Sequence, residues 1–286
     1  MAKVIIVGSG PAGVSASLYI KRGGIDVQII GKDMGALAKA EKIENYYGFE
    51  NGISGKDLIE TGINQAKNLG VEVTNDEVVG ISYDGDFIVK TKQSEYKANA
   101  LVMATGTSRK APSIKGLAEF EGRGVSYCAV CDAFFYRKKD VAILGNGEYA
   151  LNEANEIANV ASIVTILTNG NEPDTDFGKY SVVKTEISEI TGDGKVEKVL
   201  LKDGTEVNVS GIFVAVGTAS TSDLARKIGA FIENNKIIVN DKMETNISGL
   251  YAAGDCTGNM LQVAKAVYEG AVAGTEALKF VRGQNK

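Results

Sequence analysis

The 286-residue chain contains no histidine. This absence excludes Ser-His-Asp and Cys-His catalysis, and it excludes every metal site that needs an imidazole ligand. Any proton transfer must therefore use carboxylate, lysine, tyrosine or cysteine side chains.

Cysteine is also scarce, with Cys128, Cys131 and Cys256 as the three examples. Three thiols are too few for a four-thiolate zinc or iron–sulfur site within one chain. A redox pair at Cys128 and Cys131 plus one separate thiol fits better. In a reducing cytoplasm a C-x-x-C pair is more often catalytic than structural.

Long apolar runs are missing, since stretches such as Val4-Ile5-Ile6-Val7 are far short of a membrane span. These valines and isoleucines lead directly into glycines, without the charged and apolar regions of a secretory signal. We therefore expect a soluble cytoplasmic protein that does not bind membranes. The net charge of −5 also argues against binding to nucleic acid, which requires basic surface.

Glycine, with 34 residues against 3 prolines, often follows short β-branched runs, where strand-to-helix turns would lie. Two βαβ units are predicted, each a strand, a helix and a strand: Lys3–Val7, Ala12–Arg22 and Asp26–Ile30, then Val141–Leu144, Ala150–Ala158 and Ser162–Leu167. Short strands follow each unit, and Leu261–Phe280 is expected to form a long helix.

The repeated pattern predicts an α/β fold of two Rossmann-like, three-layer domains of the dinucleotide-binding type. We expect the second domain to be inserted in the first. The first would comprise residues 1–113 and 240–286, and the inserted domain residues 114–239.

The first glycine turn, between the first strand and first helix, consists of Gly8, Ser9, Gly10, Pro11, Ala12 and Gly13. Glycines there allow a tight turn and a close approach of backbone amides to a pyrophosphate. The alternative is a merely structural glycine turn. The next strand lacks the acidic residue that usually binds a ribose, because Ile30 is followed by Gly31 and Lys32.

The thiol pair Cys128 and Cys131 lies in an aromatic segment and is followed by Asp132, which is placed to move a proton. A helix starting here would stabilise a thiolate. The alternatives are two buried small residues or half of a metal site. Cys256 is expected to fill space rather than to react.

Taken in order, GSGPAG, GALAKAEKIENYYGF, ATG, CAVCDAFFY, a second glycine turn and YAAGD resemble the low-molecular-weight thioredoxin reductases. The resemblance covers essentially the whole chain. It implies a homodimeric flavoprotein with an FAD domain at residues 1–113 and 240–286, and a C-x-x-C pair in the inserted domain that reduces thioredoxin.

The resemblance also implies roles for individual residues. Gly8, Gly10 and Gly13 would bind the FAD pyrophosphate, with Ser9, Pro11, Ala12, Gly31 and Lys32 beside them, while Asn45, Thr105 and Gly106 line the site. Gly254 and Asp255 would bind the ribityl-phosphate region, and Gln262 and Val263 would approach the isoalloxazine. Cys131 would face the flavin, Cys128 would attack thioredoxin, and Asp132 would be the general acid.

The second glycine turn, Gly145–Ala150, departs from the family pattern because Glu148 and Tyr149 stand where a pyrophosphate must approach. The basic cluster that holds the 2′-phosphate of NADPH in this family is replaced by Thr168–Asn171. Three carboxylates follow, at Glu172, Asp174 and Asp176. The predicted second site is therefore a degenerate pyridine-nucleotide site.

This degenerate site resembles that of the ferredoxin-dependent flavin thioredoxin reductases, which implies reduced ferredoxin as the electron donor. Residues 105–140 contain seven basic and four acidic residues, a net charge of +3 that would attract acidic partners. Two alternatives remain: a thioredoxin reductase that uses NADPH or NADH, and a flavin and thiol redox sensor without catalysis.

Overall fold

The computed structural model describes residues 3–106, 112–217 and 221–284, without the side chains of residues 130–131 and 221–222. Contacts divide the chain into two compact units, unit 1 with residues 1–108 and 220–286 and unit 2 with residues 109–219. Each is described by itself. No helix among the described residues is both long enough and apolar enough to cross a membrane.

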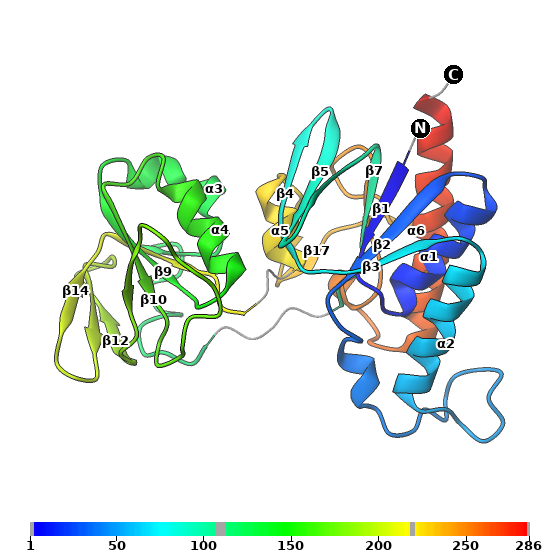
Figure 1. Cartoon of the computed structure of the whole chain (residues 1–286), viewed down its shortest axis with the longest axis horizontal. Coiled ribbons are helices and arrows are strands. Elements are labelled where there is room, and N and C mark those ends of the chain that lie inside the picture. Colours follow the sequence, from blue (N-terminus) through cyan, green and yellow to red (C-terminus); the bar gives the residue numbers. More distant parts are fainter. Residues whose placement is uncertain (1–2, 107–111, 218–220, 285–286) are drawn as a thin grey trace. The chain divides into compact units, whose positions relative to one another are not determined.

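Unit 1 is built on a five-stranded parallel sheet (Figure 1). Its strands are, in spatial order, β18 (Leu250–Ala252), β7 (Ala100–Met103), β1 (Lys3–Val7), β2 (Asp26–Gly31) and β3 (Glu72–Asn75). Val7 pairs with both Met103 and Ile30, so the carboxyl ends of β7, β1 and β2 meet at one edge. Loops with glycine follow all three strands at this edge.

Two further layers cover this sheet (Figure 1). One contains the helices α1 (Pro11–Arg22), α2 (Gly55–Asn68) and α6 (Val263–Gln284), and the other the antiparallel strands β4 (Val78–Asp84), β5 (Asp86–Thr91) and β6 (Glu95–Ala98). Helices α1 and α6 pack at very short range. A Cβ added at Gly270 would lie 2.1 Å from the Ala12 carbonyl oxygen.

Unit 2 repeats this plan. Its parallel sheet has the order β11 (Ser181–Val183), β10 (Ile163–Leu167), β9 (Asp140–Leu144), β15 (Gly211–Val214) and β8 (Val125–Ser126). Around it lie α3 (Ala129–Asp132), α4 (Glu148–Ile157) and the antiparallel strands β12 (Ile187–Thr191), β13 (Lys198–Leu201) and β14 (Glu206–Asn208).

The side chains of β9 alternate between the two cores of unit 2, as expected for a central strand. Val141 and Ile143 pack with α4, while Ala142 and Leu144 pack with the core that contains β12 and β13. The predicted α/β fold with two Rossmann-like domains is thus confirmed.

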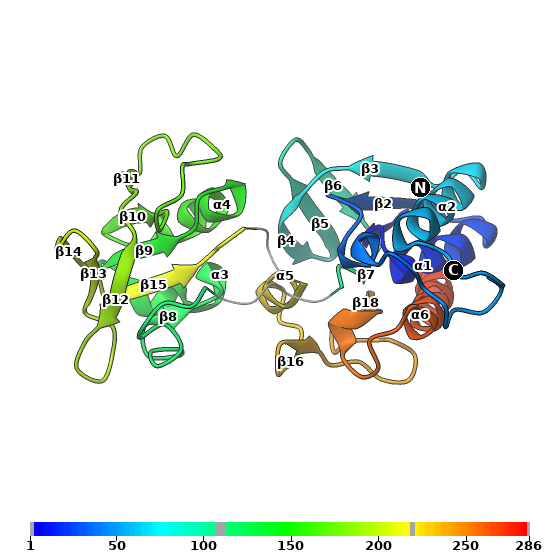
Figure 2. The same ribbon diagram turned by 90° about the horizontal axis from the view of Figure 1, so that it is seen from below.

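The division of the chain differs from the expected one at its second boundary. Three short elements, α5 (Thr221–Lys227), β16 (Ile232–Glu233) and β17 (Lys236–Ile237), belong to unit 1. Helix α5 packs against β4 (Figure 2). Strand β17 packs against the 3₁₀ turn η3 (Asp255–Thr257). Unit 2 accordingly ends at residue 219 rather than 239, and it begins at 109 rather than 114. Two further 3₁₀ turns are η1 (Ala36–Lys39) and η2 (Ala133–Tyr136).

Candidate cofactor and thiol sites

The first glycine turn joins β1 to α1 and is tightly packed at two of its glycines. A Cβ added at Gly8, where φ is +115°, would lie 2.3 Å from the Ala104 carbonyl oxygen. A Cβ added at Gly13 would lie 2.0 Å from the Gly8 carbonyl oxygen. Both positions exclude larger side chains because of their backbone neighbours.

Gly10 is different, because no described atom lies within 4 Å of a Cβ added there. It is the N-cap of α1, no side chain caps its amides, Pro11 follows at the first helical position, and the first turn holds no acidic residue. Uncapped amides and the positive end of the helix dipole, beside open space, suit a bound pyrophosphate.

Thr105 and Gly106 follow β7 at the same edge of the sheet. The Thr105 Oγ1 atom is buried and has no hydrogen-bond partner among the described residues. Gly106 has a φ of +77°, and nothing described lies within 4 Å of an added Cβ. A buried hydroxyl without a partner is costly, so this atom is suited to a ligand that supplies one.

Gly31 ends β2 on the other side of the turn, and Lys32 follows it. A Cβ at Gly31 would meet Ser9 Oγ at 2.5 Å, and the Ser9 hydroxyl donates to the Asp33 carbonyl oxygen at 3.2 Å. Lys32 pairs with the buried Glu77, with 3.1 Å between Nζ and Oε2. The structure thus brings Ser9 and Gly31 together, whereas the Lys32 ammonium group forms an ion pair with Glu77.

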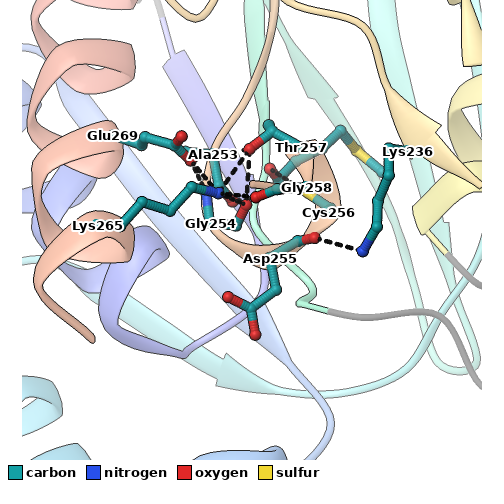
Figure 3. Close-up of polar contacts among 10 residues, drawn as sticks. Lys236, Ala253, Gly254, Asp255, Cys256, Thr257, Gly258, Lys265 and Glu269 are labelled. Carbon is teal, nitrogen blue, oxygen red and sulfur yellow. Dashed lines mark hydrogen bonds and ion pairs between the residues drawn. The ribbon is translucent and has the colours of Figure 1, made fainter. Parts of the chain in front are cut away.

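The remaining predicted cofactor residues belong to unit 1 as well. The Asn45 side-chain amide donates to Gln262 Oε1 at 3.0 Å, directly before Val263 begins α6. Gly254 has a φ of +87°, and a Cβ there would lie 3.0 Å from the Ala12 Cβ. The Asp255 carboxylate points away from the neighbouring lysine and glutamate side chains (Figure 3). The residues therefore fit a dinucleotide cofactor.

The thiol pair lies in unit 2. Cys128 is 1% exposed and disulfide-bonded, whereas Cys256 is free; the side chain of Cys131 lies outside the described part. The Cys128 amide donates to Ser126 Oγ at 3.1 Å. Asp132 ends α3, and its amide donates to the Cys128 carbonyl oxygen at 3.3 Å.

The surroundings of the thiol pair include a residue that the sequence did not indicate. Glu153 of α4 is 1% exposed, and its carboxylate accepts a hydrogen bond of 2.9 Å from the Ala129 amide, inside the C-x-x-C turn. Glu153 is 24 residues away, and no local pattern points to this contact. On the exposed side, Phe134 and Phe135 are mostly solvent-accessible. Burial and the nearby Asp132 carboxylate raise the pKa of Tyr136.

The second glycine turn is covered by a segment of its own unit, residues 172–176. Asn146 Nδ2 donates to the Glu172 carbonyl oxygen at 3.0 Å and to Asp174 Oδ2 at 3.1 Å, and the Asp174 amide donates back to the Asn146 carbonyl oxygen at 2.7 Å. Thr175 donates to the Glu148 carboxylate. The carboxylates of Glu148 and Asp174 thus lie at the second glycine turn.

The expectation that Tyr149 obstructs this turn is wrong. Its side chain is 1% exposed and packs in the core with Val141 and Ala150. The first turn of α4 points the ring inward, toward β9, and leaves the turn itself to Glu148 and the covering segment.

Cys256 occupies the buried side of η3, in unit 1. Its Sγ donates to the Ala253 carbonyl oxygen at 3.3 Å and to that of Met103 at 3.5 Å. Burial raises the pKa of this thiol to about 12. A thiol that stays protonated is a poor nucleophile, which agrees with the space-filling role expected for it.

Residues 2–270 match the model of the pyridine nucleotide-disulphide oxidoreductase family. Thioredoxin reductase from Aquifex aeolicus is 34% identical over 99% of this chain and 94% of its own, and that from Peptoclostridium acidaminophilum is 34% identical over 96% of both. The crystal structure of the atypical thioredoxin reductase TRi from Desulfovibrio vulgaris Hildenborough matches with a TM-score of 0.94 and 36% identity, over 99% of each chain. That of a ferredoxin-flavin thioredoxin reductase from Clostridium acetobutylicum matches with a TM-score of 0.71 and 37% identity, over the whole of both.

These matches define an oxidoreductase of the two-domain flavoprotein class, and its cofactor is FAD. The chain belongs to the pyridine nucleotide-disulphide oxidoreductase family and, within it, to the thioredoxin reductases.

Proposed function

We propose that this chain is a thioredoxin reductase that takes electrons from reduced ferredoxin and passes them through FAD to Cys128 and Cys131. The thioredoxin reductases among its relatives support the disulfide substrate. The observation that carries the choice of donor is the covered second glycine turn, where Asn146 and Glu148 are hydrogen-bonded to residues 172–175. The alternative donor is NADPH or NADH, as the family description suggests.

In this proposal the fifteen predicted cofactor residues bind FAD in unit 1, with the pyrophosphate at Gly10 and the N-terminus of α1. When bound, FAD would accept single electrons and supply them in pairs to the Cys128–Cys131 disulfide, which two electrons and two protons convert to two thiols. Cys128 then attacks the thioredoxin disulfide, forming one mixed disulfide and releasing one thioredoxin thiolate. Cys131 attacks the Cys128 sulfur and releases the second thiolate, and Asp132 supplies a proton.

Overall, two reduced ferredoxins and two protons convert one thioredoxin disulfide to a dithiol. A plant-type ferredoxin at about −400 mV and thioredoxin at about −270 mV make this roughly 6 kcal/mol downhill for two electrons. Because Cys128 is 1% exposed in the oxidised pair, its attack on a protein disulfide requires a change that exposes it. We further propose a homodimer that works in the cytoplasm, where thiol pairs remain reducible.

The decisive experiment mixes the protein anaerobically with each donor and follows the flavin absorption band. Reduced ferredoxin should bleach it in two one-electron steps, and neither NADPH nor NADH at millimolar concentration should do so at a useful rate. Rapid bleaching by either nucleotide would contradict the proposal and identify that nucleotide as the electron donor. Ferredoxin-dependent turnover of thioredoxin disulfide distinguishes this enzyme from a non-catalytic redox sensor.

A further inference from the structure

The loop Gly254–Gly258, which follows β18 and contains η3, is attached to helix α6 by a buried ion pair (Figure 3). Lys265 Nζ and Glu269 Oε2 are 3.0 Å apart, one helical turn from each other, and their side chains are 9% and 8% exposed. Most exposed ion pairs of this spacing contribute little to the free energy of unfolding. A buried pair, in contrast, must satisfy its hydrogen bonds within the protein.

The lysine satisfies its donors entirely on this loop and on Glu269. Its Nζ donates to the carbonyl oxygens of Gly254 at 2.8 Å and Gly258 at 2.6 Å, and to Thr257 Oγ1 at 2.9 Å. An ammonium group has three hydrogens, so Lys265 is saturated by protein atoms and is not itself a cofactor ligand.

Glu269 accepts hydrogen bonds from the same loop. Its Oε2 accepts from the Gly254 amide at 2.8 Å and from the Thr257 hydroxyl at 2.9 Å. Gly254 is therefore held at both its amide and its carbonyl by neighbouring residues of one helix. On the other side of the loop, Lys236 of β17 donates to the Asp255 carbonyl oxygen at 3.0 Å.

The contacts leave the Asp255 carboxylate outside the cluster (Figure 3). With its neighbours fixed and a φ of +87° at Gly254, these contacts hold the backbone from which the Asp255 side chain extends. The same α6 contacts Ala12, in the first glycine turn, through Gly270. The ion pair thus connects two of the segments expected to bind FAD.

We propose that Lys265 and Glu269 are positioning residues for the cofactor, which hold the Gly254–Gly258 loop, and with it Asp255, in the conformation that binds FAD. The proposal concerns FAD binding and does not depend on the electron donor. According to this proposal, loss of the pair lowers the affinity for FAD and does not only lower the stability of the fold.

The test compares Lys265→Met and Glu269→Gln with a matched control. Lys56→Met and Glu60→Gln remove the members of an exposed pair with the same spacing on α2, with 3.9 Å between their charged atoms. Apoprotein is titrated with FAD, and melting temperatures are measured with and without the cofactor. We expect each α6 variant to weaken FAD binding at least tenfold, so that FAD raises the melting temperature less than in the wild type. The α2 variants should bind FAD normally.

Two results would overturn the proposal. One is wild-type FAD affinity in both α6 variants. The other is an equal loss of melting temperature with and without FAD, which is what a purely structural pair produces. If the α6 variants do not fold, Thr257→Val decides, because it removes a hydroxyl bonded to both residues and leaves the charges paired. It should weaken FAD binding several-fold, and unchanged affinity in Thr257→Val contradicts the proposal.

Discussion

Gly10 is the residue at which packing and cofactor binding can be separated. Its φ of −75° is open to any residue, and an added Cβ meets no described atom within 4 Å, in contrast to its neighbours Gly8 and Gly13. Neither the backbone conformation nor a steric clash within the protein therefore requires glycine at this position. A pyrophosphate bound at the α1 amides would require it, because a side chain would occupy the same space.

We therefore expect Gly10→Ala to fold with a loss of about 1 kcal/mol at most, because alanine is a poorer N-cap than glycine, but to bind FAD at least tenfold more weakly. Thermal unfolding of apoprotein and titration with FAD measure the two effects. Equal FAD affinity would show that the pyrophosphate does not lie against Gly10.

The two thiols of the C-x-x-C pair should also differ in a direct test. Cys131→Ser should trap a mixed disulfide between Cys128 and thioredoxin, because the thiol that resolves it is missing. Cys128→Ser should abolish thioredoxin reduction and trap nothing. Non-reducing electrophoresis and mass spectrometry identify the adduct, and the opposite pattern would exchange the two roles.

Cys256 should contribute to alkaline unfolding. Its folded pKa of about 12 lies above the ordinary value of 9.0, so the unfolded state releases this proton first as the pH rises. The free energy of unfolding should fall from pH 9 to pH 12, by about 1.4 kcal/mol per unit at most from this thiol. Cys256→Ser should show a smaller slope in urea unfolding at pH 9–11. Tyr251, whose pKa is also raised by burial, contributes equally to both proteins. Identical slopes would contradict the assignment.

At the scale of elements, the contact of α1 with α6 depends on small residues. Gly270 and Gly274 lie against the backbone of Ala12 and Ala16, where an added Cβ would be 2.1 and 2.4 Å from the carbonyl oxygens. Gly283, at the end of the same helix, has nothing within 4 Å.

Gly270→Ala should therefore destabilise the protein by about 3 kcal/mol, because the helices must move apart. Gly283→Ala should change the free energy of unfolding by less than about 1 kcal/mol, since only helix propensity changes there. Urea unfolding of both variants tests this. A neutral Gly270→Ala would mean that the two helices can separate without loss.

The elements that sequence predicted well are those with strong local patterns. The strand at Lys3–Val7 is found with the same bounds, and the helix expected at Ala12–Arg22 differs by one residue. By contrast α5, β16 and β17 were missed as members of unit 1, because two-residue strands carry no periodicity and α5 is placed by its contact with β4. Their position depends on tertiary contacts.

The second glycine turn shows the same limit for a site. The sequence indicated the carboxylates at Glu172 and Asp174, but not that their segment folds back onto Asn146. The burial of Tyr149 could have been predicted, since it shares a helical face with the apolar residues Ala150, Ala154 and Ile157. The contact between Glu153 and Ala129 could not, because it joins separate elements.

At the scale of the whole molecule, charge is unevenly distributed. The chain carries −5, whereas residues 105–140 carry +3. Arg137 and Lys139 are exposed, as are Phe134 and Phe135, and all four follow the thiol pair closely in the sequence. An acidic protein partner would be attracted to this part of unit 2 and repelled by much of the remaining surface.

The rate of flavin reduction by an acidic ferredoxin should therefore fall several-fold between about 0.05 and 0.5 M salt, as the Debye length shrinks. Arg137→Glu with Lys139→Glu should lower the rate at low salt, while Lys195→Glu, in the exposed turn between β12 and β13, should not. Stopped-flow absorbance measures both. A rate insensitive to salt and to these charges would place the docking surface elsewhere.

The segment 172–176 has a consequence for any molecule offered to the second glycine turn. A tethered segment competes for its site at an effective concentration on the order of millimolar, and dilution never removes it. Under the proposed function, a nucleotide has to displace Asp174 from Asn146 before it binds at this turn, and its apparent dissociation constant rises with the stability of that contact. Under the proposed function, unit 2 thereby has the architecture of a nucleotide-binding domain with a segment of its own chain hydrogen-bonded to the second glycine turn. Nucleotide mimics should accordingly leave this protein unaffected.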